Sequence, residues 1–344
     1  MRYKLFGPTG LRVSELTLGT GTFGTGWGHG AEKEESRRVF DTFAEAGGNF
    51  IDTADVYQGG QSEEFLADFL RSDRDHFVVG TKYTIGPGAL SKSGNNRKNM
   101  RRALEASLGR LGTEYVDVYW LHVADGVTPM EEVMRGLDDL VREGRVHYVG
   151  LSDFPAWQAA QGATIAQLRG LAPLTALQIE YSLVERSAER DLLPMSRDFG
   201  LSFLAWSPLA GGLLTGKYRD AGAQGRKTQG GGPIQPENAR TGAIVDVVVQ
   251  VASELGCTPS QVALAWVRQQ DLGIIPILGA RTQAQLQDNL GALNVTLSGE
   301  HLARLDDVSR IDLGFPHAML ASDGIRRSVT GGKDDLIDQR SARR

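Results

Sequence analysis

Short apolar stretches alternate with longer amphipathic stretches along most of the chain. The short stretches hold three to six residues and are rich in β-branched side chains, which is typical of strands buried on both faces. The longer stretches place apolar residues three or four positions apart, which predicts helices that bury one face. The most regular of these helical stripes is Met130, Val133, Met134, Leu137, Leu140 and Val141.

Eight strands can be placed in this pattern, and a predicted helix follows each of them. The strands are predicted at residues 15–18, 49–51, 77–81, 116–121, 146–150, 175–179, 201–205 and 274–277. Ser62 is expected to cap one helix, and Thr258, Pro259 and Gln261 predict a capping box with proline at the first helical position of another. So regular an alternation indicates an α/β fold, a (β/α)8 TIM barrel with extra helices, in a single domain over residues 1–344.

Three segments fall outside the repeat. Residues 1–14 have Gly7, Pro8 and Gly10 at their centre and predict an N-terminal β-hairpin. Residues from about 217 to 240, after the seventh strand, are rich in glycine and polar residues and predict a long mobile loop beside a cofactor. Residues from about 314 to 344 predict a C-terminal tail, either wrapped over one end of the barrel or partly loose.

A glycine-rich stretch follows the first strand and contains Gly19, Gly21 and Gly24 in the spacing of a dinucleotide-binding fingerprint. That fingerprint must open a helix directly. Three more glycines follow within six residues, and each of them costs a helix about 1 kcal/mol. We therefore interpret this stretch as a flexible loop at a strand end rather than the start of a Rossmann helix.

Composition narrows the class of protein. Of the 344 residues 41% are hydrophobic and 23% charged, so the chain can bury a large core. The net charge of −5 argues against a general nucleic-acid binder. Cys257 is the only cysteine, which excludes an intrachain disulfide and a cysteine-based zinc site. No stretch approaches the roughly 20 apolar residues that span a bilayer, so we expect a cytoplasmic protein that does not contact a membrane.

Reactive side chains follow the predicted strands. Strands two to eight are followed in order by Asp52, Lys82, His122, Ser152, Gln178, Trp206 and Gly279, and Tyr57 lies in the loop after the second strand. Alone, such an aspartate is usually a turn residue, such a histidine a core residue, and such a lysine or tyrosine a surface residue. In a barrel, however, the carboxyl ends of all strands meet in one mouth, which makes these groups neighbours.

Four of these groups fit the reduction of a carbonyl compound. A lysine ammonium near Tyr57 is expected to lower the pKa of the phenol, with Asp52 holding Lys82 in place. Tyr57 could then give a proton to a developing alkoxide, and His122 could orient the same oxygen. No cluster of metal ligands is evident in the sequence, so an organic cofactor is expected to supply the hydride.

The other half of the mouth fits a nicotinamide nucleotide. Ser152, Asp153 and Gln178 could hydrogen-bond a carboxamide, and Trp206 offers a flat face for a ring. A glycine-containing loop suited to a pyrophosphate follows and contains Ser207, Leu209, Gly211, Leu213 and Lys217. Gly279 precedes a predicted helix N-terminus, an anion site, and Arg281 adds a fixed charge for a 2′-phosphate.

In these motifs the chain resembles the aldo-keto reductase superfamily over nearly its whole length. The matching motifs are Leu18-Gly19-Thr20-Gly21, Asn49-Phe50-Ile51-Asp52-Thr53-Ala54-Asp55-Val56-Tyr57, Gly80-Thr81-Lys82, Tyr119-Trp120-Leu121-His122, Gly150-Leu151-Ser152-Asp153-Phe154, Gln178-Ile179-Glu180-Tyr181-Ser182, Trp206-Ser207-Pro208-Leu209-Ala210-Gly211-Gly212 and Pro276-Ile277-Leu278-Gly279-Ala280-Arg281-Thr282. Their order and spacing make the resemblance specific.

The resemblance implies a catalytic tetrad and an extended NADPH (or NADP+) without a Rossmann domain. The tetrad is carried here by Asp52, Tyr57, Lys82 and His122. The ring-stacking position maps to Trp206, and the adenosine-phosphate end maps to Gly279, Arg281, Gln285 and Asn289. The chain departs from the family pattern at Asp153, where asparagine is usual, and at Ile277, where some members carry a basic residue.

The expected activity is NADPH-dependent reduction of an aldehyde or ketone, reversible as alcohol oxidation. One alternative is a low-turnover regulatory or scaffold protein of the same fold that binds cofactor. Another is a metal-assisted hydrolase or isomerase that uses Asp52, Asp55 and His122. The substrate pocket is expected near Phe23, Trp27, Tyr57, Tyr83, Val123 and the C-terminal tail. These residues favour a hydrophobic carbonyl compound as partner; the sequence does not indicate an oligomeric state.

Overall fold

The computed structural model describes residues 1–86, 88–219, 238–270 and 273–337 of the chain. Residues 220–237, most of the loop predicted at 217–240, lie outside the described residues. Residues 338–344, the end of the predicted tail, lie outside them as well.

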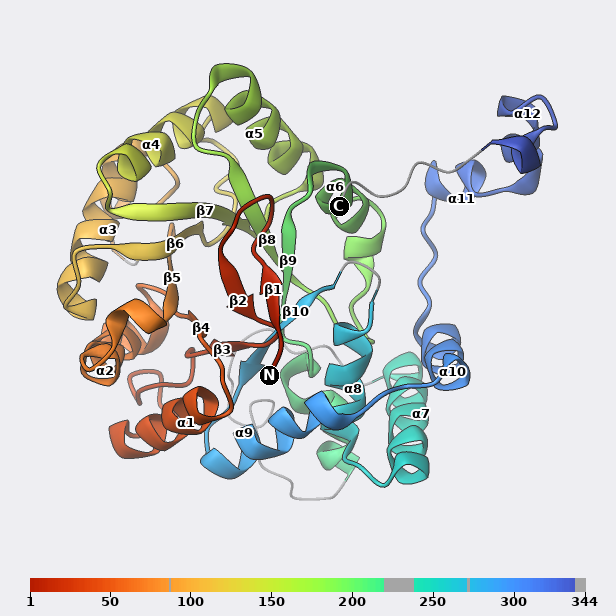
Figure 1. Ribbon diagram of the computed structural model, residues 1–344, viewed down its shortest axis with the longest axis horizontal. Helices are drawn as coiled ribbons and strands as arrows, with labels where there is room; N and C mark the ends of the chain where they lie inside the picture. The colour runs from red at the N-terminus through yellow and green to blue at the C-terminus, as the bar shows by residue number, and fades with distance from the viewer. Residues whose placement is uncertain (87, 220–237, 271–272, 338–344) are drawn as a thin grey trace.

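Eight parallel strands close into a barrel in the order β10-β3-β4-β5-β6-β7-β8-β9 (Figure 1). The strands are β3 (Thr17–Gly19), β4 (Phe50–Asp52), β5 (Val78–Tyr83), β6 (Val116–Leu121), β7 (Val146–Ser152), β8 (Leu174–Glu180), β9 (Ser202–Trp206) and β10 (Ile275–Gly279). Consecutive strands are neighbours, and β10 closes the ring against β3, with Leu278 opposite Leu18. The predicted (β/α)8 TIM barrel is confirmed.

Helices surround the barrel and cover the outer face of its sheet (Figure 1). They are α1 (Lys33–Glu45), α2 (Gln61–Leu70), α3 (Arg97–Leu111), α4 (Met130–Arg142), α5 (Ala156–Arg169), α6 (Leu192–Phe199), α7 (Ala239–Leu255), α8 (Pro259–Arg268) and α9 (Gln283–Leu290). The predicted capping box is present in α8, where Thr258 and Gln261 bond reciprocally and Pro259 is the first helical residue. Amphipathic periodicity and capping therefore place these helices as expected.

Ser62 does not cap its helix, contrary to the sequence prediction. Gly60 occupies the N-cap position of α2, with φ +101°, and the hydroxyl of Ser62 lies inside the first turn. It donates to Thr20 and contacts the hydroxyl of Thr53 at 2.9 Å, fully buried. A serine two positions into a helix can bond a neighbouring strand instead of its own backbone, and tertiary packing decides between the two.

The N-terminal hairpin closes the floor of the barrel. Its strands β1 (Tyr3–Leu5) and β2 (Arg12–Ser14) pair antiparallel, as predicted. Phe6 is fully buried and makes edge-on ring contacts with Phe50 at 5.5 Å and Trp120 at 6.3 Å inside the barrel. Because Phe50 begins β4, the hairpin lies at the amino ends of the strands. The opposite, carboxyl end is left for a functional site.

The glycine stretch after β3 forms a loop, as interpreted from the sequence. Gly19 is the last residue of β3, and α1 begins only at Lys33. Two isolated bridges to Ala31 fold the intervening segment back on itself. Gly24 has φ +121°, a conformation that side-chain-bearing residues rarely adopt. The segment therefore does not open a helix, which removes the dinucleotide-fingerprint interpretation.

Further helices follow the eight repeats. The first, α10 (Gly299–Ser309), begins at a capping box formed by Ser298 and His301 and packs against α7. It was not predicted individually, although Ser298 precedes Leu302 and Leu305 at helical spacing. No single helix among the described residues is long and apolar enough to cross a membrane; α7 and α8 meet that length and composition only as a pair, across a 98° bend.

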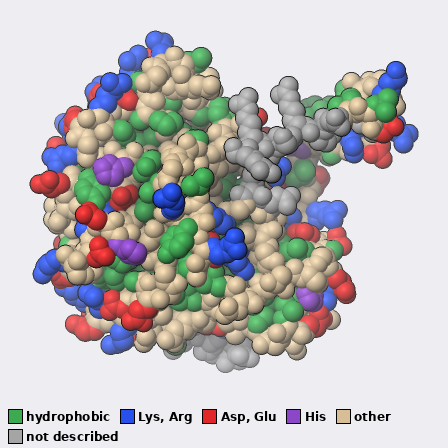
Figure 2. Space-filling model, in the orientation of Figure 1, with side chains coloured by type: hydrophobic (Ala, Val, Ile, Leu, Met, Phe, Trp, Pro, Cys, Tyr) green, Lys and Arg blue, Asp and Glu red, His purple; other side chains and the backbone are tan. Residues whose placement is uncertain are grey.

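A C-terminal arm, residues 314–337, contacts the residue before α6 through His317, whose Nε2 lies 3.3 Å from Oδ1 of Asp191, and then extends away from the barrel (Figure 1). It carries α11 (His317–Leu320) and α12 (Asp323–Val329), and no residue of either helix is buried. Hydrophobic side chains lie at its surface (Figure 2), among them Phe315, which is 83% exposed. The described part of the predicted tail therefore does not wrap over either end of the barrel.

Candidate active site

The residues predicted to form one mouth do meet at the carboxyl end of the barrel. Asp52, Ser152, Trp206 and Gly279 are the last residues of β4, β7, β9 and β10, and His122 directly follows β6. β5 runs slightly further than predicted, so that Lys82 lies within it and not after it. Gln178 lies within β8, and the strand predicted at residues 175–179 already included it. Strand ends are the least certain feature of a sequence pattern, because polar residues can continue a ladder that apolar residues begin.

Lys82 is the centre of the site, and its three ammonium hydrogens each have an acceptor. Its Nζ lies 2.5 Å from Oδ2 of Asp52, 2.8 Å from the carbonyl oxygen of Thr53 and 3.1 Å from the hydroxyl of Tyr57. The side chain is fully buried and that of Asp52 is 2% exposed. A buried ion pair is tolerated when its remaining donors and acceptors are satisfied, as they are here. Thr53 was not identified from the sequence because it contributes only a backbone carbonyl.

Gln178 holds the other oxygen of Asp52. Its Nε2 donates to Oδ1 of Asp52 at 2.9 Å. The carboxylate is thus fixed by an ammonium on one oxygen and an amide on the other. Burial raises the pKa of Asp52, and Lys82 and Gln178 oppose that effect. Burial disfavours the Lys82 ammonium, but Asp52 and Tyr57 outweigh burial and raise the pKa of Lys82, which keeps it protonated.

A strained turn places Tyr57 over Lys82. Gln58, the next residue, has φ +53°, and two glycines with positive φ follow it. The side chain of Gln58 fixes the turn to the glycine loop, because Nε2 donates to the carbonyl of Gly21 and Oε1 accepts from the backbone of Trp27. Gln58 was not predicted as a site residue. The strained turn could have been suspected from the glycine pair alone.

The ring of Tyr57 lies between two other rings. His122 is 5.8 Å away and Trp27 is 6.0 Å away, both measured between ring centroids and both edge-on. The pKa of Tyr57 is raised, not lowered as predicted: burial raises it most, Lys82 lowers it and Asp52 raises it again. The prediction considered the ammonium alone, whereas the Asp52–Lys82 pair is close to neutral. A protonated Tyr57 at neutral pH is the form that donates a proton.

His122 is neutral at physiological pH. Burial, and then the charge of Lys82, lower its pKa to about 3. Its Nδ1 is buried and has no hydrogen-bond partner among the described residues. A neutral imidazole beside Tyr57 can hydrogen-bond a carbonyl oxygen without bringing a second positive charge next to Lys82.

The residues expected to hold a carboxamide lie side by side. Ser152 and Gln178 are directly opposite each other in the ladder of β7 and β8. The amide nitrogen of Gln178 is used by Asp52, which leaves its oxygen as an acceptor, and the hydroxyl of Ser152 is a donor. One donor and one acceptor next to each other complement a carboxamide, which accepts through oxygen and donates through nitrogen. The site therefore fits a nicotinamide.

Asp153 contacts Trp206 in this half of the site. Its Oδ1 accepts a 2.9 Å hydrogen bond from Nε1 of Trp206, which is half-buried. Burial raises the pKa of Asp153 to about 6, while the bond from Trp206 and the charge of Lys82 oppose the rise. Asp153 stands where asparagine is usual in the family, and in this chain its carboxylate contacts the indole of Trp206.

The predicted phosphate-binding residues form two groups. Ser207, Leu209, Gly211 and Leu213 lie in and before a tight turn after β9, where Ser207, Ala210 and Gly211 all have positive φ, and Lys217 follows it. The second group lies at the start of α9, which Thr282 caps. There the side chain of Gln285 accepts from the backbone of Arg281 at 2.9 Å, and Asn289 donates to the carbonyl of Gly279 at 3.3 Å.

Two of the five residues predicted for the substrate pocket, Phe23 and Tyr83, lie in the core instead. Trp27, 44% exposed, and the half-buried Val123 lie at the rim. Phe23 and Tyr83 are fully buried in the core; Phe23 packs on Phe69 and Tyr83 stacks on Tyr119. Alternation along a strand could have excluded Tyr83, because Lys82 faces the barrel interior and its neighbour must then face the helices.

The three residues of the alternative metal site do not form one. Within the described ranges, no group of three histidine, cysteine, aspartate or glutamate residues is placed to hold a metal ion. Asp52 is committed to Lys82 and Gln178, and Asp55 lies near Glu63 and Arg110 instead.

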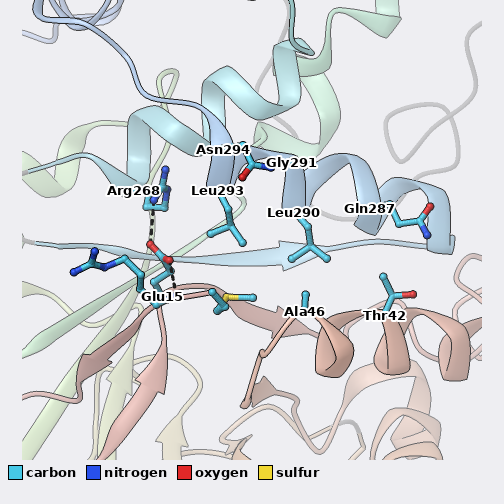
Figure 3. A pocket seen from close by; sticks show the side chains of 11 residues that line it. Glu15, Thr42, Ala46, Arg268, Gln287, Leu290, Gly291, Leu293 and Asn294 are labelled. Atoms are coloured by element: carbon cyan, nitrogen blue, oxygen red, sulfur yellow. Dashed lines mark hydrogen bonds and ion pairs between the residues drawn. The ribbon is translucent and has the colours of Figure 1, made fainter.

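A separate groove of about 540 Å³ lies at the other end of the barrel (Figure 3). Its lining comes from the N-terminus and from the ends of α1, α8 and α9, with Glu15 and Arg268 paired at 3.0 Å. These elements meet at the amino ends of the strands, so the groove is not part of the candidate site.

Comparison with known proteins agrees with this geometry. Residues 15–310 match the profile described as the Aldo/keto reductase family. The chain is 38% identical to a norsolorinic acid reductase of Aspergillus flavus over 89% of this chain and 80% of that protein. It is 34% identical to an aryl-alcohol dehydrogenase [NADP(+)] of Phanerodontia chrysosporium over 92% and 87% of the two chains. It is also 32% identical to a putative aryl-alcohol dehydrogenase of Saccharomyces cerevisiae over 91% and 88%.

Proposed function

The chain belongs to the aldo/keto reductase family and is an oxidoreductase of carbonyl or alcohol groups, and we propose that it is an NADPH-dependent reductase of aromatic aldehydes or ketones, reversible as an alcohol dehydrogenase. The observation that carries this proposal is the buried pair of Asp52 and Lys82, with the half-buried Tyr57 bonded to Lys82 and His122 beside it. The pKa values of Lys82 and Tyr57 are raised and that of His122 is lowered to about 3, so at neutral pH Lys82 is charged and the other two are neutral, as carbonyl reduction needs.

The proposed proton donor is Tyr57. Its oxygen accepts a hydrogen bond from Lys82 at 3.1 Å, and an ammonium has no lone pair to accept one in return. The phenolic hydrogen of Tyr57 is therefore free to point at the oxygen of a substrate. As that oxygen gains negative charge, Lys82 stabilises the phenolate that Tyr57 becomes.

The other members hold this arrangement. Asp52 and the carbonyl of Thr53 fix Lys82, and the neutral imidazole of His122 positions the substrate oxygen. A nicotinamide nucleotide bound in this site would supply the hydride for the carbonyl carbon. Tyr57 would give the proton to the carbonyl oxygen, which completes the alcohol. The reverse transfers oxidise the alcohol.

Cofactor binding is assigned to the other half of the mouth. Ser152 and Gln178 would hold the carboxamide and Trp206 the ring. The turn after β9 would hold the pyrophosphate. Arg281, at the N-terminus of α9, would bind the 2′-phosphate that distinguishes NADPH from NADH. The name of the Phanerodontia relative, which specifies NADP(+), supports this preference.

An aromatic substrate is supported by two observations. The curated relatives are named for norsolorinic acid and aryl alcohols. In this chain Trp27 lies at the rim with its ring 6.0 Å from that of Tyr57, so an aromatic carbonyl compound would meet an indole beside the proton donor. We propose such a small molecule, in the cytoplasm, as the partner, with no nucleic acid or membrane.

Cofactor titration and turnover together test the proposal. Purified protein is titrated with NADPH and with NADH by nicotinamide fluorescence, and oxidation of NADPH by benzaldehyde derivatives is followed at 340 nm. Tight NADPH binding with turnover is expected. NADPH binding without turnover on any aldehyde or ketone would favour the low-turnover regulatory alternative, and failure to bind either nucleotide would refute the proposal.

A further inference from the structure

Asp153 is held rigidly against the indole that faces the proposed cofactor site. Its Oδ1 accepts from Nε1 of Trp206 at 2.9 Å. Its backbone is anchored on both sides, because its N–H donates to Gln178 at 3.1 Å and its carbonyl accepts from Ala124 at 3.4 Å. The φ of Asp153 is +51°, a conformation that aspartate and asparagine tolerate better than other side chains. The carboxylate therefore has a fixed place at the edge of Trp206.

The charge of Asp153 is not paired in the way that the charge of Asp52 is. Asp52 and Lys82 form a buried ion pair, and His122 is neutral above its pKa of about 3. The hydrogen-bond partner of Asp153 is the neutral indole of Trp206. With the pKa of Asp153 at about 6, its carboxylate is ionised at and above neutral pH. Asp52, Lys82, His122 and Asp153 together therefore carry a net negative charge, which is that of Asp153.

We propose that the carboxylate of Asp153 makes this site favour the oxidised nicotinamide nucleotide over the reduced one, an inference that rests on the proposed function. The oxidised nicotinamide ring carries a positive charge, and the reduced ring is neutral. A ring placed on Trp206 lies beside the indole whose edge Asp153 contacts. Opposite charges attract strongly where water is excluded, whereas the neutral ring gains nothing from the carboxylate.

The direction of the reaction follows from this difference in affinity. A site that binds the oxidised cofactor more tightly shifts the equilibrium between the bound reactants towards NADP+ and the alcohol, the products of carbonyl reduction. Asp153 is a specificity-determining residue for the oxidation state of the cofactor, and it takes no part in proton transfer. Its replacement should change the relative affinity for the two forms without disturbing Tyr57, Lys82 or Asp52.

The matched variant is Asp153→Asn. Asparagine has nearly the same shape, tolerates the backbone conformation of residue 153, and keeps an oxygen that can accept from Trp206. The substitution therefore removes the charge and little else. Dissociation constants for NADP+ and for NADPH are measured separately at pH 8, by quenching of protein fluorescence and by nicotinamide fluorescence. We expect the ratio of the NADP+ constant to the NADPH constant to rise about tenfold in the variant.

The same ratio measured against pH gives a second readout. Protonation of Asp153 removes its charge, so in the natural protein the preference for NADP+ should be present above about pH 6 and should fade below it. The groups facing this region are Asp52, Lys82, Tyr57 and His122. Lys82, Tyr57 and His122 keep one protonation state between pH 5 and 8. Burial raises the pKa of Asp52, but Asp52 is present in both proteins, so the comparison with Asp153→Asn isolates residue 153. The Asp153→Asn variant should show a flat ratio, equal to that of the natural protein at low pH.

The outcomes separate this inference from the proposed function. If the natural protein binds neither nucleotide, the proposed function fails. If it binds both and Asp153→Asn weakens both equally, residue 153 only supports the loop and the inference is overturned; an unchanged ratio with unchanged affinities overturns it too. The exposed acid Asp198, on α6, provides the control for net charge, and Asp198→Asn should leave the ratio unaltered.

Discussion

The side-chain amide of Gln178 reaches Asp52 from the opposite side of the barrel, with a hydrogen bond of 2.9 Å. Gln178 belongs to β8 and Asp52 to β4, which are four positions apart in a closed ring of eight strands. Since Lys82 takes the other carboxylate oxygen, the acid is fixed from two directions. Gln178 also lies opposite Ser152, so one side chain connects the proposed catalytic acid–base group to the proposed carboxamide site.

Replacement of Gln178 by methionine should therefore affect both halves of the site. The variant leaves one buried oxygen of Asp52 without a donor, which should lower the free energy of unfolding by about 1–3 kcal/mol. It also removes the acceptor for the carboxamide, so NADPH should bind more weakly. Urea unfolding and fluorescence titration measure the two effects. Gln287→Met, at an exposed position on α9, should change neither. A stable variant with full NADPH affinity would show that the cross-barrel bond has no such role.

Replacement of Tyr57 by phenylalanine should remove turnover and leave cofactor binding. The phenol hydroxyl is the only group lost, and the ring contacts with Trp27 and His122 remain. General acid catalysis contributes about 10²- to 10⁴-fold, so kcat should fall by that order. Single-turnover measurements at 340 nm report on the chemical step, and titration with NADPH reports on cofactor binding. Retention of most of the activity would assign the proton to another group.

Most of the fold, and the meeting of the candidate acid–base residues at one end of the barrel, could be predicted from the sequence. Apolar periodicity identified eight strands, and the rule that barrel strands end in one mouth then brought Asp52, Lys82 and His122 together. That inference needs only the order of the strands. It does not depend on the exact residue at which each strand ends, so the error of two residues at the end of β5, beside Lys82, did no harm.

Features that depend on three-dimensional packing could not be predicted in the same way. The hydroxyl of Ser62 bonds Thr20, directly after β3, rather than its own helix, and the indole of Trp206 bonds Asp153. Neither partner is near in sequence. The direction of the Tyr57 pKa was mispredicted because it depends on how far burial outweighs a nearly neutral ion pair, which no sequence pattern records. The position of Tyr83, in contrast, could have been predicted, because side chains alternate between the two faces of β5 and Lys82 faces the barrel interior.

Replacement of Arg281 by alanine should reduce the preference for NADPH. A charge-assisted hydrogen bond is worth roughly 1.5–3 kcal/mol, so the dissociation constant for NADPH should rise about 10- to 150-fold. NADH lacks the 2′-phosphate, and its affinity in the same variant is the internal control. The backbone of Arg281 is held by Gln285 and does not depend on the side chain that is removed. Equal losses for both nucleotides would place the 2′-phosphate elsewhere.

Removal of the C-terminal arm should leave the barrel as stable as before. Neither α11 nor α12 has a buried residue, so a chain ending at Leu313 loses no core packing. The contact of His317 with the exposed Asp191 at 3.3 Å is lost, but an exposed pair contributes little, so thermal and urea midpoints should be nearly unchanged. The KM for a small aryl aldehyde should be unchanged as well, because beyond that contact the described part of the arm extends away from the barrel (Figure 1). A chain that ends before α10 is the contrasting control, because α10 buries Leu305 and packs on α7. A raised KM in the Leu313 variant would instead support the predicted contact between tail and pocket.

Asp55 should make the fold less stable at alkaline pH. Its Oδ1 is buried and has no hydrogen-bond partner among the described residues. Burial, and then the nearby carboxylate of Glu63, raise the pKa of Asp55 from 3.8 to about 7. Because the folded pKa exceeds the unfolded one, folding binds the proton more tightly, and the cost of ionised Asp55 is fully present above about pH 7 and declines as the pH falls towards 4.

Replacement of Asp55 by asparagine should therefore stabilise the protein, and more so at high pH. From the separation of the two pKa values, the gain in the free energy of unfolding should be roughly 2–3 kcal/mol larger at pH 8 than at pH 5. Urea unfolding at the two pH values measures the difference, with Asp198→Asn as the control for net charge. Equal effects at pH 5 and pH 8 would mean that the ionised carboxylate of Asp55 is compensated in the folded protein, so that Arg110 and Arg102, whose charges lower its pKa, outweigh burial and Glu63.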